Sequence, residues 1–215
     1  IAKYPHSGKF GFNLMTQELI CGVFKQNVLL GLNVLEYYLE KGNISGFYPN
    51  MLYTLILKDA AAKYDDIYKL IKKYFFNNRA NWFLAYYERL PSKDITRQLT
   101  EDLLSFYNTL NVRVKLDERQ YDNFLSIEPC IYEKILTILL DKSNLDNSNK
   151  FELGWKFFQN NNTLLQTNLT LCKKAYLNQV QYHNSYDFDK SEFLCLYDRD
   201  KSFVLEFIKK IISLN

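Results

Sequence analysis

The residues best suited to chemistry form a short basic and aromatic run between Arg79 and Arg89. Trp82, Tyr86 and Tyr87 lie between these two arginines. Stacking on aromatic faces, combined with positive charge that neutralises phosphates, is how proteins hold unpaired bases. The run therefore indicates a contact with single-stranded nucleic acid. Trp82 and Tyr86 are also spaced as i and i+4, which favours a helix-core role for these two side chains and leaves the arginines to line a groove.

A second candidate is the group of aspartates near the end of the chain, which could hold a hard cation. These are Asp187, Asp189, Asp198 and Asp200. No glycine lies in this stretch to make the sharp turn of a calcium-binding loop, so the sequence favours ordinary loop and helix-start charges. The chain also has no phosphate-binding glycine loop, metalloprotease helix or nucleophile elbow. We therefore expect no catalysis, metal or cofactor, and an enzyme with an unfamiliar active site stays only as a third alternative.

The four cysteines form no Cys-x-x-Cys pair, and the chain has only two histidines, so no zinc site is expected. Each cysteine stands in an apolar helical context, which predicts buried free thiols and a reducing compartment. The cysteines are Cys21, Cys130, Cys172 and Cys195. No apolar run approaches the roughly 18 residues of a membrane span. The start at Ile1, without a signal-like segment, predicts a mature form or a piece of a longer protein.

Composition points to an all-α fold. The chain has 7 glycines and 4 prolines, few for the tight turns of an all-β fold. Apolar residues recur at three- and four-residue spacing, as in Ile67, Leu70, Ile71 and Tyr74. With 27 basic and 24 acidic side chains the net charge is +3, which permits nucleic-acid binding without indicating it.

Two consecutive helical hairpins repeat the same pattern between Thr16 and Tyr74. Setting Gly31 of one second helix against Ile67 of the next gives a spacing of 36 residues, and Leu103 follows at the same interval. A two-helix unit with this period is the signature of an α-solenoid. The sequence predicts about five antiparallel hairpins in a right-handed superhelix.

The domain organisation follows from this pattern. We expect an irregular lead-in over residues 1–11, a single repeat domain over 12–215, and a possible hinge at the polar stretch 141–150. Asn27 is the expected N-cap of the helix that ends near Gly42. The helices expected after residue 90 are 92–110, 121–126, 129–140, 151–158, 163–177, 191–196 and 202–214, with an extended connector at 112–116.

The hairpins from Thr16 to Tyr74 resemble pentatricopeptide repeats. The resemblance rests on the second helices, Leu30–Gly42 and Asp66–Tyr74, on the lead-in Ala60–Ile67, and on a spacing close to the family's period. It covers about a quarter of the chain well and about half loosely. In that family the first helices line a concave surface, and a residue early in each contacts an RNA base. Carried over by spacing, these positions are the polar Thr16 and the apolar Leu52.

The resemblance implies a non-catalytic protein that binds single-stranded RNA, with lysines and arginines neutralising phosphates and other side chains contacting bases. It also implies an organelle factor for mRNA stability, processing or translation. An AT-rich-looking composition agrees with a mitochondrial location, the alternatives being cytoplasmic or nuclear. The predicted RNA-binding residues are Thr16, Lys25, Leu52, Lys58, Arg79, Trp82, Arg89 and Arg97.

A second function stays open. Helical solenoids of the tetratricopeptide type share this two-helix build and a similar period. In such a protein-interaction scaffold, the groove between first helices receives a peptide or a partner helix. An apolar concave face, with Leu52 and Leu55 exposed, favours the scaffold, whereas salt-sensitive binding of single strands favours RNA.

Overall fold

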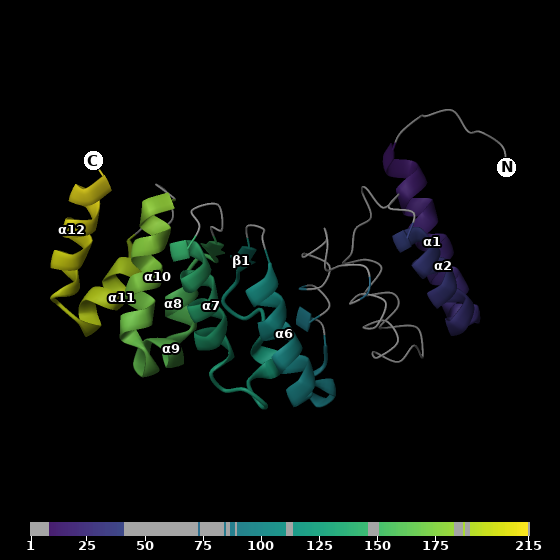
Figure 1. The fold of residues 1–215 in the computed structure, drawn as a ribbon, viewed down its shortest axis with the longest axis horizontal. Helices are drawn as coiled ribbons and strands as arrows, with labels where there is room; N and C mark the ends of the chain where they lie inside the picture. The colour runs from purple at the N-terminus through teal and green to yellow at the C-terminus, as the bar shows by residue number, and fades with distance from the viewer. Residues whose placement is uncertain are drawn as a thin grey trace. The chain divides into compact units, whose positions relative to one another are not determined.

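The computed structural model describes residues 9–40, 73, 84, 87–88, 90–110, 114–145, 151–182, 187 and 190–214 (Figure 1). The chain divides into two compact units, Ile1–Arg89 and Leu90–Asn215. The described part is mostly helical, which confirms the all-α class.

In the first unit, two helices meet at a one-residue break. Helix α1 spans Lys9–Gln26 and α2 spans Val28–Glu40, so α1 begins within residues 1–11, which were expected as an irregular lead-in. The backbone N–H of Leu30 donates to Asn27 Oδ1 at 3.0 Å. This bond satisfies one of the free N–H groups in the first turn of α2, and it confirms Asn27 as the predicted N-cap.

The two helices pack through a glycine. A Cβ atom at Gly31 would lie 2.5 Å from Phe24 Cγ, so only glycine lets the helix backbone come this close to the ring. Ile20, Phe24 and Leu35 are buried around this contact. Gly31, which marks the repeat in the sequence, is therefore a packing position of α2.

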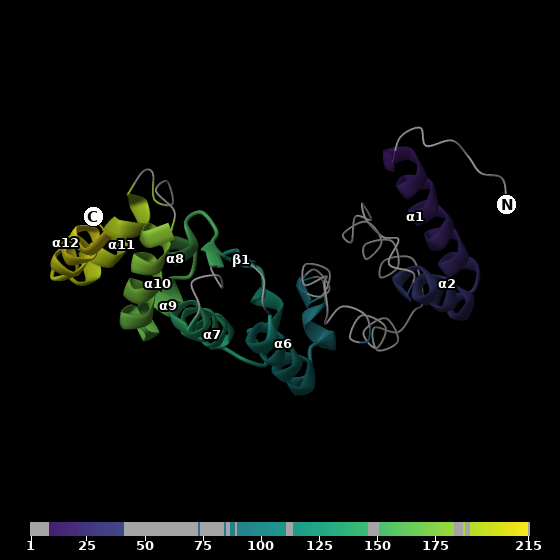
Figure 2. The ribbon, with the colours of Figure 1, turned by 45° about the horizontal axis from the view of Figure 1, so that its top comes forward.

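The second unit is a longer series of helices with two short strands (Figure 1). Its elements are η1 (Ser92–Asp94), α6 (Arg97–Thr109), β1 (Val114–Leu116), η2 (Asp122–Phe124), α7 (Ile131–Leu145), β2 (Phe151–Leu153), α8 (Phe157–Asn160), α9 (Asn162–Thr167), α10 (Leu169–Tyr182), α11 (Ser191–Arg199) and α12 (Phe203–Leu214). Helices α6, α7, α10 and α12 follow one another across this unit, each packing against the next (Figure 2). Helix α11 likewise packs against α8.

Side-chain hydrogen bonds join α10 to α7, and α7 to the end of α6, between residues 32 to 35 apart in the sequence. Asn168 Nδ2 donates to Glu133 Oε1 at 2.8 Å, and Asn178 Nδ2 donates to Ser143 Oγ at 2.9 Å. Both pairs are 35 residues apart. Lys142 Nζ reaches the carbonyls at the end of α6 over separations of 32 to 35 residues. Helix α10 is therefore bonded to α7, and α7 to the end of α6, whereas the bonds from α12 and the turn before it to α10 span 27 and 29 residues.

Large aromatic side chains fill the spaces between these elements, as the aromatic content predicts. Tyr107 and Tyr121 are fully buried, and their hydroxyls are 2.8 Å apart. Tyr132 donates its hydroxyl to Asp122 Oδ1 at 2.8 Å, and it accepts from the backbone N–H of Tyr121 at 2.9 Å. Burial raises the pKa of Tyr132, so the phenol stays neutral. These rings contribute packing area while their hydroxyls stay hydrogen-bonded.

The strands β1 and β2 pair in parallel, with Val114 opposite Phe151, and the connection between them contains α7. The fully buried side chain of Gln179 forms hydrogen bonds with the edge of β2 that faces away from β1. It accepts from Leu153 N at 3.0 Å and donates to Phe151 O at 3.1 Å. Strand β1 confirms the extended connector predicted around Val114, whereas β2 was not predicted.

The prediction of a helix over residues 151–158 is wrong in its first half. Phe151 and Leu153 are both buried, which is the alternation of a strand. Gly154 then lies against β1, where a Cβ atom would be 2.6 Å from Asp117 Oδ1. Lys156 adopts a left-handed φ of 58°, so a helix starts only at Phe157. The sequence hides this turn because lysine is not a usual left-handed residue.

Other boundaries also shift. Asn168 accepts from Leu171 N at 3.0 Å and separates α9 from α10, dividing the helix predicted over 163–177. Helix α7 continues to Leu145, through the first half of the predicted hinge, while residues 146–150 lie outside the described ones. Residues 121–126 contain only the 3₁₀ turn η2. The final helix agrees with its prediction to within a residue.

Candidate functional site

The predicted RNA-binding residues fall in both units. Lys25 is exposed in the last turn of α1, and Thr16 belongs to the same helix. Arg97 is exposed as the first residue of α6. The other five lie outside the described residues: Leu52, Lys58, Arg79, Trp82 and Arg89. Leu55, named for the scaffold alternative, lies outside them as well. As a set, the RNA-binding residues stay a prediction.

Of the four aspartates considered for a cation, Asp187 and Asp200 accept backbone N–H groups near the starts of α11 and α12, Asp198 pairs with Lys201, and Asp189 lies outside the described residues. Asp187 accepts from the backbone N–H groups of Glu192 and Phe193, at 3.2 and 2.8 Å, and thereby caps α11. Its carboxylate also accepts the hydroxyl of Tyr176 at 2.8 Å. Within the described ranges, no group of three or more His, Cys, Asp or Glu side chains could hold a metal ion.

A groove of about 460 Å³ lies where α8 and α9 face α11. Arg199 Nη2 donates to Asn162 Oδ1 at 2.5 Å across it, joining residues 37 apart in the sequence. Asp198 beside it accepts from Lys201 Nζ at 2.8 Å. The lining side chains are Gln159, Asn162, Leu165, Cys195, Asp198 and Arg199.

The chemistry of this groove suits binding rather than covalent reaction. Burial raises the pKa of the Cys195 thiol, and the nearby Glu192 carboxylate adds to the effect. The thiol is therefore protonated at neutral pH and is a weak nucleophile. Gln159, Asn162 and Arg199 offer hydrogen-bonding groups at the surface, while Leu165 is buried beneath them. A carbonyl, a carboxylate or the edge of a base could pair with these groups.

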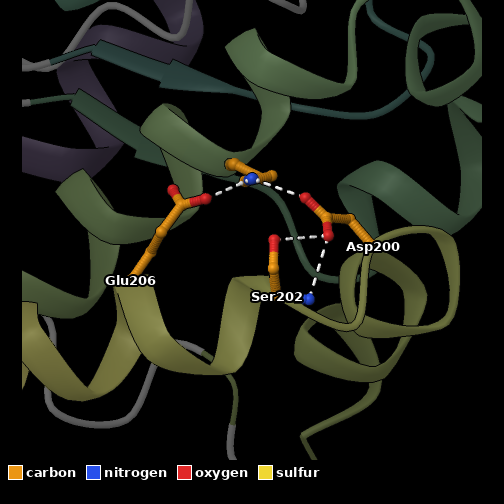
Figure 3. Close-up of polar contacts among 4 residues, drawn as sticks. Asp200, Ser202 and Glu206 are labelled. Atoms are coloured by element: carbon orange, nitrogen blue, oxygen red, sulfur yellow. Dashed lines mark hydrogen bonds and ion pairs between the residues drawn. The ribbon is translucent and has the colours of Figure 1, made fainter.

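A cluster of charged side chains joins α12 and the turn before it to α10 (Figure 3). Lys173 of α10 is only 12% exposed, and its ammonium lies 2.8 Å from Asp200 Oδ2 and in contact with the Glu206 carboxylate. Asp200 Oδ1 accepts from both N and Oγ of Ser202, at 2.9 and 2.6 Å. The hydrogen bond from Lys173, with those from Ser202, lowers the pKa of Asp200 to about 2. The same carboxylates raise the pKa of Lys173, so this cluster stays ionised near neutral pH.

Several basic side chains of the second unit are engaged by groups within it. Of the chain's 27 basic and 24 acidic side chains, residues 90–215 carry 16 and 17 respectively. Lys142 binds the carbonyls at the end of α6, and Lys156 lies 4.4 Å from the centre of the Trp155 ring. Ion pairs are formed by Lys115 with Asp117, Lys134 with Glu128, Lys173 with Asp200 and Glu206, and Lys201 with Asp198. Because residues 90–215 carry 16 basic and 17 acidic side chains, this unit has no excess of positive charge.

Sequence reasoning missed both the groove and the Lys173 cluster. At Asn160–Asn162 the sequence predicted only a break between two helices. It also predicted a helix that ends at Leu196, before Arg199. No pattern in the sequence relates Asn162 to Arg199, which lie 37 residues apart. The cysteine prediction also needs correction, because Cys130 is exposed in the turn before α7. The other three thiols are buried or half-buried, and none of the four cysteines forms a disulfide.

No protein-family profile, curated protein or solved structure matches this chain. Among the helices that the structure describes, none has the length and apolar character needed to cross a lipid bilayer.

Proposed function

We propose that this chain is a non-catalytic α-solenoid of helical hairpins that binds single-stranded RNA. One observation supports the repeat architecture most strongly. Two side-chain bonds between α10 and α7 join residues 35 apart, and a bond between α11 and α9 joins residues 37 apart, so the separation lies near 36 residues. This value agrees with the 36-residue spacing of Gly31, Ile67 and Leu103 in the sequence. In stacked repeats each unit contacts mainly its neighbours, which produces such a constant separation.

The RNA part of the proposal rests on the first unit and on the resemblance to pentatricopeptide repeats. Residues 1–89 carry 11 basic and 7 acidic side chains, which accounts for the positive charge of the chain. Lys25 is exposed at the end of α1, on the same helix as Thr16. In this account the lysines and arginines neutralise phosphates, and the aromatic and polar side chains contact bases. The cellular role would be that of an organelle mRNA factor acting in stability, processing or translation.

Fluorescence anisotropy of the full chain with labelled single-stranded and duplex RNA tests this proposal. We expect micromolar or tighter binding of the single strand, with affinity that falls steeply as salt rises, because counterions are released from each neutralised phosphate. Lys25→Glu should weaken binding, whereas Lys93→Glu, an exposed lysine outside the predicted set, should change it less. Absence of binding at low salt would reject the RNA proposal.

A protein-interaction scaffold is the second candidate, and the charge balance of residues 90–215 favours it. The groove beside α11 combines amide, guanidinium and apolar groups, which suits an extended peptide. In this alternative, RNA binding is absent or insensitive to Lys25→Glu. Arg199→Glu would then weaken a protein partner without affecting any RNA signal.

A further inference from the structure

Ser202 lies at the solvent-exposed side of the Lys173 cluster, whose lysine is 12% exposed. Its side chain is exposed on the turn between α11 and α12. Both its hydroxyl and its backbone N–H donate to the Asp200 carboxylate, whose other oxygen binds Lys173 (Figure 3). A chemical change at the Ser202 hydroxyl would therefore act directly on the bonds that tie α12 to α10.

The sequence before Ser202 has the charge pattern that many protein kinases select. Arg199 lies three residues before the serine and Lys201 one residue before it, and both side chains are exposed. Kinases discriminate substrates by such patterns of charge around the acceptor. An exposed hydroxyl on a turn between two helices is also accessible to an enzyme's active site.

We propose that Ser202 is a phosphorylation site whose modification releases α12 from α10. The co-reactants are a protein kinase and the magnesium complex of a nucleoside triphosphate. Ser202 Oγ forms a bond to the γ-phosphorus, and the bond from that phosphorus to the β–γ bridging oxygen breaks. The hydroxyl proton passes to the kinase's base, and the nucleoside diphosphate leaves.

The phosphoryl group changes the local charges in a definite way. It adds a charge of roughly −1.5 to −2 and removes the O–H that donates to Asp200. The added charge lies beside the carboxylates of Asp200 and Glu206, which share Lys173 as an ion-pair partner. If Lys173 turns towards the phosphate, Asp200 loses its ammonium partner, and if it does not, the phosphate and Asp200 repel each other. In each case the hydroxyl bond from Ser202 to Asp200 is lost, and the added charge opposes the backbone bond that remains. The partial positive charge of the α12 N-terminus favours an anion and acts in the opposite direction.

Release of α12 would uncover an aromatic cluster. Phe203 and Phe207 of α12 lie 5.7 and 6.2 Å from the ring of Tyr176, measured between ring centres. Phe207 also lies 5.1 Å from Phe193 of α11. Modification would thereby convert a charge change at the surface into exposure of apolar area. This inference stands apart from the proposed RNA function and does not depend on it.

The test treats the folded full-length chain with a protein kinase selective for a basic residue three positions before serine, together with magnesium ATP. Mass spectrometry should locate the phosphate on Ser202, and Ser202→Ala should abolish it. The control variant Ser213→Ala removes another exposed serine of α12 and should leave incorporation unchanged. Hydrogen exchange of the phosphorylated chain should then be about tenfold faster or more over residues 200–207, as expected for loss of a charge-assisted bond.

A synthetic peptide covering residues 196–208 shows whether the kinase accepts this sequence. If the peptide is phosphorylated while Ser202 of the folded chain is not, the site is inaccessible and the proposal is overturned. If the peptide is not phosphorylated, the kinase does not recognise the charge pattern before Ser202, and the proposal is likewise overturned. Phosphorylation of Ser202 with unchanged or slower exchange in α12 would overturn the release of the helix.

Discussion

The two units of this protein distribute their charges differently. Residues 1–89 carry 11 basic and 7 acidic side chains, whereas residues 90–215 carry 16 and 17. In the second unit many of the described lysines bind carboxylates, carbonyls or an aromatic ring. The modest net charge of +3 therefore conceals a positive first unit and a nearly balanced second one. Long-range attraction of a polyanion is expected from the first unit, while the second uses its charges mainly to join helices.

The units also differ in how their helices are held together. In the first, α1 and α2 approach closely because Gly31 leaves room for the Phe24 ring. In the second, buried aromatic rings fill the core, and hydrogen bonds between residues 35 apart link α7 to α10. Substitutions in the two units should therefore differ in size and in kind.

The largest effect is expected in the aromatic core of the second unit. Phe157 is fully buried, with its ring centre 5.5 Å from that of Phe158 and 6.2 Å from that of Tyr132. Phe157→Ala should lower the free energy of unfolding by about 3–5 kcal/mol through lost burial and a new cavity. Urea unfolding of the full chain measures this change. Phe157→Leu should cost clearly less, and equal costs would mean that the ring is not packed as described.

A smaller loss is expected where a single buried amide holds strand β2. Gln179→Ala would leave Leu153 N and Phe151 O without their side-chain partner, at a cost of about 1–3 kcal/mol for each unpaired group. The exposed Gln98→Ala is the matched control, with an expected change within about 0.5 kcal/mol. The two variants should be compared by urea unfolding under the same conditions. Similar values for both would contradict the role of Gln179.

Two glycine substitutions should change stability in opposite directions. Gly154→Ala places a Cβ atom 2.6 Å from Asp117 Oδ1 and 3.1 Å from Asp117 Cα, and should destabilise the second unit by about 1–3 kcal/mol. Gly22 lies within α1 with no atom near its added Cβ, so Gly22→Ala should stabilise that helix by about 0.5–1 kcal/mol. Thermal unfolding followed by circular dichroism measures both. A shift in the same direction for both variants would contradict the described packing.

The smallest expected effect is on the stability of the fold at acid pH. Because the pKa of Asp200 is lowered to about 2 from its usual 3.8, its carboxylate stabilises the fold above the unfolded-state value. That contribution should decline as pH falls from about 4 to about 2, where Asp200 gains a proton and its bond to Lys173 weakens. Asp200→Asn should remove this part of the pH dependence. Hydrogen exchange of α12 at several pH values measures it, and an identical pH profile in the variant would contradict the assignment.

The sequence predicted the features that depend on local chemistry. Apolar periodicity gave the all-α class, and the amide of Asn27 and the final helix were placed correctly because both follow from short-range patterns. Strand β2 was missed since its pairing depends on β1 and Gln179, far away in the sequence. The left-handed turn at Lys156 was hidden because lysine rarely adopts that conformation.

The candidate sites were harder to predict than the helices. Lys173, Asp200 and Glu206 meet only after α10 and α12 pack, and no spacing in the sequence brings them together. Asn162 and Arg199 lie 37 residues apart and meet only where α9 packs near α11. Pairings between distant segments are fixed by packing, so periodicity alone does not reveal them.

The most direct test of the account is to map where RNA touches the full chain. Photo-cross-linking of a labelled single-stranded RNA, followed by mass spectrometry of the adducts, gives contacts by residue. The account predicts adducts concentrated between residues 16 and 97, and a loss of binding in Arg79→Glu combined with Arg89→Glu while thermal unfolding stays nearly unchanged. Adducts concentrated in residues 114–214, or a double variant that binds RNA normally, would contradict it.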